Sequence, residues 1–373
     1  MIIGAPAEVK KDDKKIALTP SLVRSLTDLG HKVIVQKDFG ILAGFSNDEF
    51  ESNGAELSIS AEEIYSKSDI IVKINQPTLD EYDLLREKQV IFAFFNYSDK
   101  NNLMQTILKK KITTISFSKI KNKYGNYPFI KAGSEIVGKT LVRIASYVAE
   151  KRMGGALISG ATGVPPMKIT IVGAGTVGFN AAKTAASVGA DVSVLDINPH
   201  ELRRIENLSG LKIKTYFSNS ENIEKLLPDT DILICAVKRK NKQMPPIISA
   251  ENIKLLKKGA LVLDAGLASG HVAVETMDRI LTADNPIYEN NGILYFCAPD
   301  IASFAAKSIS LAVSGNLAGY LISAASNKDI IDALRENREL ISGVMTYNGN
   351  ITDELTAEML GEHVYELSML TGF

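Results

Sequence analysis

The stretch KITIVGAGTVG, residues 168–178, decides the fold of this chain. Its first five residues have the β-branched character of a buried strand, and glycines follow directly at 173, 175 and 178. The small residues of 180–188 then favour a helix. A strand, a glycine-rich turn and a helix open a βαβ unit, whose two strands are parallel and joined by a right-handed crossover. This stretch therefore predicts a parallel sheet.

The next strand of this unit, DVSVL at 191–195, ends on Asp196. An acidic residue about 20 positions after the glycines completes the dinucleotide-binding fingerprint. A carboxylate there can accept hydrogen bonds from both ribose hydroxyls and repels a 2′-phosphate. We therefore expect NAD(H) to be preferred to NADP(H). The alternative is a glycine-rich turn that binds nothing.

Each position of the fingerprint has a physical role. Gly173 permits the tight turn, Gly175 lets a pyrophosphate approach the backbone, and Gly178 lets helix and strand pack closely. The helix N-terminus, at Thr176 and Val177, faces the phosphates with its positive dipole end. These five residues and Asp196 are the predicted cofactor site.

Outside this unit, apolar runs of strand length alternate with segments of helical spacing. Strands are predicted at residues 1–5, 32–36, 69–74, 90–95, 112–117, 232–236, 260–264 and 293–296. Helices are predicted at residues 20–28, 135–151, 302–324 and, more weakly, 357–370. The Gly- and Pro-rich segment 154–166 is predicted to be an interdomain loop. This alternation predicts an α/β fold with two Rossmann-like, doubly wound domains.

Composition limits the possible classes of protein. A length of 373 residues suits two domains, and 42 Lys and Arg against 43 Asp and Glu leave no basic field for nucleic acid or an anionic membrane. Cys235, Cys297 and four histidines supply neither a disulfide framework nor metal-ligand spacing. No run of about 18 uncharged apolar residues occurs. We expect a cytoplasmic protein without a signal peptide, a metal site or membrane insertion.

Short motifs along the chain carry a further indication. They are Gly4-x-Pro6-x-Glu8-x-Lys10, Thr19-Pro20, Gly30-His31-x-Val33, Lys73 with Pro77, Ser134-Glu135, Asp196-Ile197-Asn198 and APDIAS at 298–303. In this order and spacing the chain resembles the alanine dehydrogenase and transhydrogenase alpha-subunit family over nearly its whole length. The resemblance implies a discontinuous substrate domain, residues 1–130 plus 303–373, with an NAD-binding domain, residues 131–302, inserted into it. It also implies that Ser134 and Ser218 join the NAD site. We further expect a homo-oligomer that acts on a small molecule.

The positions at which such alanine dehydrogenases carry their reacting groups are substituted in this chain. In the resembling enzymes an arginine and a lysine hold the keto acid. By this resemblance, Lys15 stands in place of the arginine and Asn75 in place of the lysine. Asn96 replaces a histidine and Ala268 an aspartate that handle protons. A lysine lacks the bidentate fork of arginine, and an asparagine cannot titrate. Asp300 introduces a carboxylate where the family has a glycine.

The candidate pocket thus consists of Lys15, Lys73, Asn75, Asn96 and Asp300, with His271 as a further proton donor. Structural alternatives are a strand lysine for Lys73, a helix cap or turn for Asp300 and a solvent-facing loop residue for His271. The basic cluster 238–242 could touch phosphate or lie exposed.

Three functions remain open at this point. The first is an NAD-dependent oxidoreductase acting on an amino acid or keto acid other than alanine and pyruvate. The second is a non-catalytic NAD-binding protein. The third is a transhydrogenase alpha subunit, which ranks last because about 35 residues between Asp196 and Asp231 leave little room for that subunit's long mobile segment.

Overall fold

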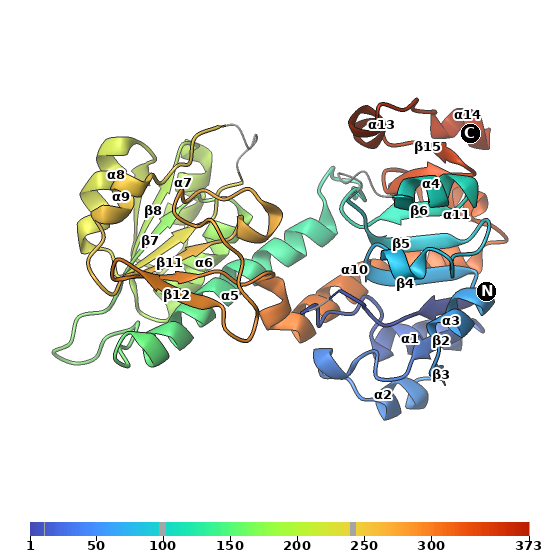
Figure 1. Ribbon diagram of the computed structural model, residues 1–373, viewed down its shortest axis with the longest axis horizontal. Helices are drawn as coiled ribbons and strands as arrows, with labels where there is room; N and C mark the ends of the chain where they lie inside the picture. The colour runs from blue at the N-terminus through green and yellow to red at the C-terminus, as the bar shows by residue number, and fades with distance from the viewer. Residues whose placement is uncertain (11, 97–101, 239–243, 373) are drawn as a thin grey trace. The chain divides into compact units, whose positions relative to one another are not determined.

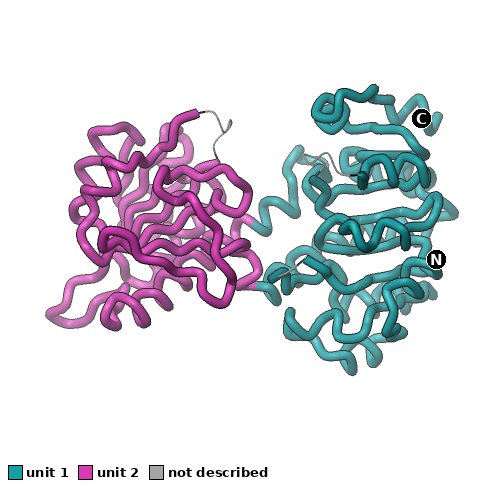
Figure 2. Tube along the Cα trace, in the orientation of Figure 1, with its two compact units in different colours: residues 1–133, 306–373 teal, residues 134–305 magenta. Residues whose placement is uncertain are grey.

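The computed structural model describes residues 1–10, 12–96, 102–238 and 244–372 (Figure 1). The chain divides into two compact units, unit 1 from residues 1–133 with 306–373 and unit 2 from residues 134–305 (Figure 2). Unit 1 is therefore built from both ends of the chain. Residues 239–242 of the basic cluster lie outside the described residues.

Unit 2 contains a seven-stranded sheet in the order β12-β13-β11-β10-β7-β8-β9. Its parallel strands are β7 (Lys168–Val172), β8 (Asp191–Asp196), β9 (Ile213–Phe217), β10 (Ile232–Cys235), β11 (Leu261–Asp264) and β13 (Ile293–Phe296). The edge strand β12 (Ile287–Asn290) runs antiparallel to β13. In chain order the six parallel strands follow the 3-2-1-4-5-6 arrangement of a doubly wound domain. The predicted α/β fold class is confirmed, with an antiparallel edge that the sequence did not indicate.

Successive residues of the strands in unit 2 pack alternately into two apolar clusters, one on each face of the sheet. Ile232 and Ile234 of β10 belong to one apolar cluster, whereas Leu233 and Cys235 belong to another. The first cluster includes residues of α5 (Pro128–Arg152), α6 (Thr176–Ser187) and α7 (Pro199–Glu206), and the second includes residues of α8 (Ser220–Leu226) and α9 (Ala250–Lys254). Burial on both faces explains why the central strands β7, β10, β11 and β13 are nearly continuous apolar runs.

Unit 1 contains an eight-stranded sheet in the order β15-β14-β6-β5-β4-β1-β2-β3. The parallel strands are β1 (Ile2–Ala5), β2 (Lys32–Gln36), β3 (Ala55–Ser58), β4 (Ile70–Asn75), β5 (Val90–Phe94) and β6 (Thr113–Ser116). The hairpin of β14 (Val344–Tyr347) and β15 (Asn350–Ile351) joins β6 antiparallel, so the C-terminal segment completes the sheet. The sequence patterns predicted neither this hairpin nor β3.

Helices complete unit 1. They are α1 (Pro20–Asp28), α2 (Asn47–Ser52), α3 (Ala61–Lys67), α4 (Asn102–Lys109), α10 (Ala306–Ser326), α11 (Ile330–Glu336), α12 (Arg338–Ile341), α13 (Glu354–Leu360) and α14 (Leu367–Thr371). The predicted single helix at 357–370 is wrong: α13 ends at Gly361, whose φ of +69° is the left-handed conformation of a helix C-terminus. Helix α5 begins at Pro128 rather than at residue 135.

One stretch of helix, Ala302–Ser326, is long and apolar enough in composition to cross a membrane, although half of its most apolar window is buried within the protein. Two of its serines bond to the backbone before α1. The Ser310 hydroxyl accepts from Ile16 N at 2.9 Å, and that of Ser314 accepts from Thr19 N at 3.1 Å. Helix α10 is thus a core helix of unit 1.

Candidate functional site

Two glycines, one in the loop after β7 and one in the first turn of α6, are required by packing in unit 2. Gly173 has a φ of +101°, and a Cβ there would lie 2.8 Å from Ala236 O. A Cβ on Gly178 would lie 1.7 Å from Gly173 O. No side chain fits at either position without a shift of the backbone, so the strand, the turn and the helix are held close together.

Gly175 differs from both of these glycines. A Cβ at this position would meet nothing within 4 Å, and its φ of −60° is open to any residue. Gly175 is also the N-cap of α6, where no side chain caps the helix and no acidic residue occupies the first turn. The absence of a side chain leaves room for a phosphate to approach the uncapped amides, as the phosphates do in dinucleotide-binding domains.

The carboxylate of Asp196, at the end of β8, binds the backbone of the glycine loop. Its Oδ2 accepts a hydrogen bond from Ala174 N at 2.6 Å, and its Oδ1 accepts one from Asn198 N at 2.8 Å. Ser218 N donates to Asp196 O at 3.0 Å, which places the predicted Ser218 at the same edge of the sheet. Ile197 beside it is 80% exposed.

Helix α5 contacts the start of α6 through another glycine. A Cβ on Gly138 would lie 2.3 Å from Val177 O, so the two helices approach at backbone distance. Ser134 lies one turn earlier on the same face of α5 and is half-buried. The structure therefore brings Ser134, Val177 and the glycine loop into one region of unit 2.

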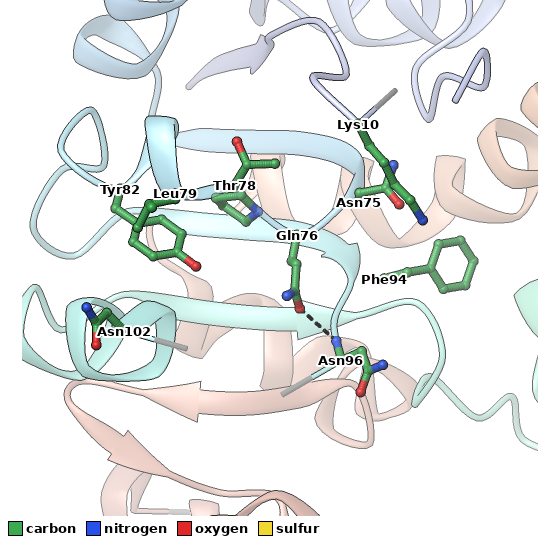
Figure 3. A pocket seen from close by; sticks show the side chains of 10 residues that line it. Lys10, Asn75, Gln76, Thr78, Leu79, Tyr82, Phe94, Asn96 and Asn102 are labelled. Atoms are coloured by element: carbon green, nitrogen blue, oxygen red, sulfur yellow. Dashed lines mark hydrogen bonds between the residues drawn. The ribbon is translucent and has the colours of Figure 1, made fainter. Parts of the chain in front are cut away.

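A cavity of about 680 Å³ lies in unit 1 at the carboxyl ends of β4 and β5 (Figure 3). Its lining residues are Lys10, Asn75, Gln76, Pro77, Thr78, Leu79, Tyr82, Phe94, Asn96 and Asn102. Lys10, Asn75 and Phe94 lie at one end, with Tyr82 and Asn102 at the other (Figure 3). Apart from Lys10 and Tyr82, the lining carries amides, one hydroxyl and apolar groups.

Asn75, the last residue of β4, is held by two carboxylates. Its Nδ2 donates to Glu8 Oε2 at 3.0 Å and to Asp13 Oδ2 at 2.8 Å. Asp13 in turn forms an ion pair with Lys15, at 2.9 Å between Nζ and Oδ1. The predicted pocket residues Lys15 and Asn75 are therefore joined through Asp13.

The side chain of Lys73, two residues before Asn75 in β4, is enclosed by the protein. Its side chain is 1% exposed, and its Nζ lies 2.8 Å from Glu81 Oε1, 3.2 Å from Ala7 O and 3.9 Å from Glu8 Oε2. Burial raises the pKa of the Glu8 carboxyl, against the lowering effect of Lys73 and of the hydrogen bonds from Asn75 and Ile74. Lys73 does not line the cavity, which agrees with its structural alternative as a strand lysine.

Asn96 follows β5 and lines the cavity with an exposed side chain. Its backbone N donates to Gln76 Oε1 at 2.8 Å, which ties the segment after β5 to the segment after β4 (Figure 3). The structure thus places Asn75 and Asn96 around one cavity, with Lys15 and Lys73 behind Asn75.

The remaining candidates belong to unit 2. Asp300 Oδ1 accepts from Ala302 N at 2.9 Å, and its Oδ2 accepts from the Ser303 hydroxyl at 3.0 Å, as in a helix cap. Ala268 is exposed in the loop after β11, which buried Asp264 holds by accepting from three backbone amides. His271 is half-buried in this loop rather than solvent-facing, and its Nδ1 is buried without a partner in the described residues.

Glu8, Asp13 and Glu81, which contact Asn75 and Lys73, were not among the predicted site residues. Glu8 was present in the N-terminal motif, and Asp13 lies two residues before Lys15. An acidic residue close to each lysine was the available signal, since charges are buried in pairs. The contact of both Glu8 and Asp13 with Asn75 depends on how residues 6–15 fold over β4, which no local pattern encodes.

Comparisons with known proteins agree with this two-unit architecture. Residues 4–137 match the N-terminal and residues 142–354 the C-terminal domain model of "Alanine dehydrogenase/PNT". The alanine dehydrogenases of Methanococcus maripaludis and Bacillus subtilis are each 33% identical, over 96% and 97% of this chain and 96% and 95% of theirs. A solved L-alanine dehydrogenase superposes with a TM-score of 0.90 at 27% identity, covering 97% of this chain and 99% of its own. A transhydrogenase from Sinorhizobium meliloti shares the fold, with a TM-score of 0.80 at 20% identity over 95% of this chain and all of its own. With both domain models matched in order along the chain, this protein belongs to the alanine dehydrogenase/PNT family.

Proposed function

We propose that this protein is an NAD(H)-dependent oxidoreductase that interconverts an amino acid and its keto acid, with a substrate other than alanine and pyruvate. The open space at Gly175, beside the carboxylate of Asp196, carries the cofactor part of this proposal. The amide-lined cavity of unit 1 carries the substrate part.

The residues present fit the adenine-ribose and pyrophosphate portions of NAD. The first turn of α6, Thr176–Gly178, would hold the pyrophosphate, and Asp196 would accept from the ribose hydroxyls, with Ser134 and Ser218 as further contacts. When bound, the nicotinamide ring accepts or supplies the hydride. The protein's part is to orient the two ligands and to exclude water.

The substrate assignment rests on what surrounds Asn75 and Asn96. Where the resemblance implies a lysine and a histidine, this chain has two amides that bind and orient but do not titrate at neutral pH. The buried Lys15 is already paired with Asp13. A pocket for pyruvate would need a free cation for the carboxylate and a proton donor for the carbonyl. Lys10, exposed at the cavity, is the cation best placed to meet a carboxylate.

A non-catalytic NAD-binding protein is the second candidate, and the cavity lining favours it specifically. Lys10 and Tyr82 are the titratable side chains among the lining residues, and burial raises the pKa of Tyr82 further above its usual range. The raised pKa moves Tyr82 away from neutral pH, where a general acid or base is most effective.

Cofactor choice is the first prediction. NADH should bind at least about 10-fold more tightly than NADPH, because the Asp196 carboxylate repels a 2′-phosphate. Asp196→Asn should narrow this ratio, since it removes the charge but retains an oxygen that can accept from Ala174 N. Calorimetric titration of both cofactors measures the ratio.

Asp191→Asn is the matched control, because it removes a charge from the opposite end of the same strand, where Asp191 pairs with Lys214. It should leave the ratio unchanged. Equal affinities of the unmodified protein for the two cofactors would contradict the assignment. Catalysis is tested separately, by single turnover of the NADH-bound protein with a panel of keto acids and ammonium: oxidation of NADH supports the enzyme, and binding without oxidation favours the second candidate.

A further inference from the structure

The side-chain amide of Asn75 has a fixed orientation. Glu8 and Asp13 are carboxylates that accept hydrogen bonds, so only an NH₂ group satisfies both at 3.0 and 2.8 Å. Both amide hydrogens are therefore committed. The oxygen Oδ1 remains, on a residue that lines the cavity.

This oxygen is open to a ligand. No described residue donates a hydrogen bond to Asn75 Oδ1, and the atom is not among the buried polar atoms left without a partner. It is therefore accessible, and the cavity is the space that the Asn75 side chain faces (Figure 3). At this point the wall of the cavity offers a hydrogen-bond acceptor.

The charges behind Asn75 favour the same type of ligand. The carboxylates of Glu8, Asp13 and Glu81 are paired with the two ammonium groups of Lys15 and Lys73. Three acidic groups thus face two basic ones in a largely buried cluster. Lys10, which lines the same end of the cavity, is the cation that would meet the substrate carboxylate, so the excess negative charge behind Asn75 remains for the amine.

We propose that Asn75 determines specificity in this site, its Oδ1 accepting a hydrogen bond from the protonated amine of the substrate, so that the cavity binds the amino acid in preference to the corresponding keto acid. This inference rests on the proposed function. The lysine that the resemblance implies at this position could only donate, and it would favour the carbonyl oxygen of a keto acid. The replacement of that lysine by Asn75 therefore reverses the polarity of this contact.

The test compares matched pairs of ligands that differ in one group. L-alanine with pyruvate, L-2-aminobutyrate with 2-oxobutyrate, and L-glutamate with 2-oxoglutarate are titrated into the protein saturated with NADH. Without added ammonium no reductive amination occurs, so calorimetry measures binding alone. For the pair that binds best, the amino acid should bind roughly 10-fold or more tightly than its keto acid, as expected for a charge-assisted hydrogen bond.

Two substitutions of Asn75 test whether this residue causes the preference for the amino acid. Asn75→Lys should lower the amino-to-keto ratio by roughly 10-fold or more, because it replaces the acceptor with an ammonium group. Asn75→Ser shortens the side chain, keeps a donor for one carboxylate and should bring the ratio towards one. The control is Asn126→Lys, which makes the same substitution at an exposed residue of unit 1 whose side chain forms no hydrogen bond in the described structure. It should leave the ratio unchanged.

Each outcome decides a different question. NADH binding to the unmodified protein is measured before any substrate is added. If NADH does not bind, the proposed function is overturned. NADH binding combined with an amino-to-keto ratio of one or less would overturn this inference alone. An unchanged ratio in folded Asn75→Lys or Asn75→Ser would do the same. If both variants fail to fold, the ratio of the unmodified protein still decides.

Discussion

Gly175, the N-cap of α6, and Gly178, in its first turn, differ in whether the protein itself requires a glycine. Gly178 is fixed by the protein itself, because a Cβ would lie 1.7 Å from Gly173 O. Gly175 is not, because its Cβ position is open and its φ is unstrained. The sequence pattern predicted that Gly175 leaves room for a pyrophosphate and that Gly178 lets helix and strand pack closely. The Cβ distances agree with this difference, because a Cβ on Gly178 would clash and one on Gly175 would not.

This difference predicts opposite effects of the same substitution. Gly178→Ala should destabilise unit 2 by about 3 kcal/mol or more, because the backbone must shift to admit the methyl group. Gly175→Ala should change stability by less than about 1 kcal/mol, since alanine adopts this φ without strain. It should nevertheless weaken NADH binding by at least about 10-fold, because the methyl group occupies the approach of the pyrophosphate.

Calorimetric unfolding measures the first effect and titration with NADH the second. The two variants serve as controls for each other, since the change in volume is identical. If Gly175→Ala binds NADH as tightly as the unmodified protein, the open space at Gly175 is not where a phosphate lies.

At the scale of elements, the strands of both sheets were largely predictable and their irregular neighbours were not. Strand β7 has the predicted bounds because KITIV is buried on all but its first residue. The β14–β15 hairpin was missed although Asn348-Gly349 at its turn is a hairpin signal, with φ of +47° and +85°. Its pairing with β6 links segments more than 200 residues apart, which no local pattern encodes. Helix α5 was predicted too short because its first turns, with Gly133 and Ser134, lack apolar periodicity.

Helix α10 provides a prediction at this scale. Thr19, the N-cap of α1, makes no capping bond with its own side chain; its hydroxyl and its amide both bond to the Ser314 hydroxyl, at 2.8 and 3.1 Å. Ser314→Ala should therefore lower the free energy of unfolding by about 1–3 kcal/mol, because buried polar groups of Thr19 lose their partner. Ser308→Ala, an exposed substitution in the same helix, should change it by less than about 0.5 kcal/mol.

Chemical denaturation followed by circular dichroism measures both variants in parallel. Equal stability of Ser314→Ala and Ser308→Ala would show that the serine bonds do not join α10 to the segment before α1. A loss in Ser314→Ala alone supports the role of α10 as a core helix whose polar residues are satisfied inside unit 1.

At the scale of the whole molecule, family and fold were predictable from motifs, whereas the chemistry of the site was not. The fingerprint and the order of the short motifs led to the correct family. The resemblance also predicted substituted catalytic positions at residues 15, 75, 96 and 268. That Asn75 would be clamped by Glu8 and Asp13, however, depends on three segments meeting at the edge of one sheet. The sequence thus predicted which positions to inspect, but not which contacts surround Asn75.

The last prediction concerns alanine dehydrogenase activity itself. With pyruvate, ammonium and NADH, the rate should fall at least about 10³-fold below the ~10 s⁻¹ typical of enzymes, because a positioned proton donor alone contributes about 10²–10⁴. The penalties of the four substitutions do not multiply, since the residues act as a unit. Following NADH oxidation at saturating substrate measures the rate, and a turnover near 10 s⁻¹ would contradict the prediction.

The combined variant Lys15→Arg, Asn75→Lys, Asn96→His, Ala268→Asp tests the cause of this deficit. Asn75→Lys adds an ammonium group to a cluster that has one carboxylate in excess, and Ala268→Asp falls on an exposed residue, so both can be accommodated. Lys15→Arg keeps the ion pair with Asp13 while adding a bidentate fork. Activity that rises in this variant, together with a shift of binding towards the keto acid, would mean that the pocket lost its reacting groups but kept its shape. No rise in activity, despite intact NADH binding, would mean that the cavity wall itself has been reshaped for another substrate.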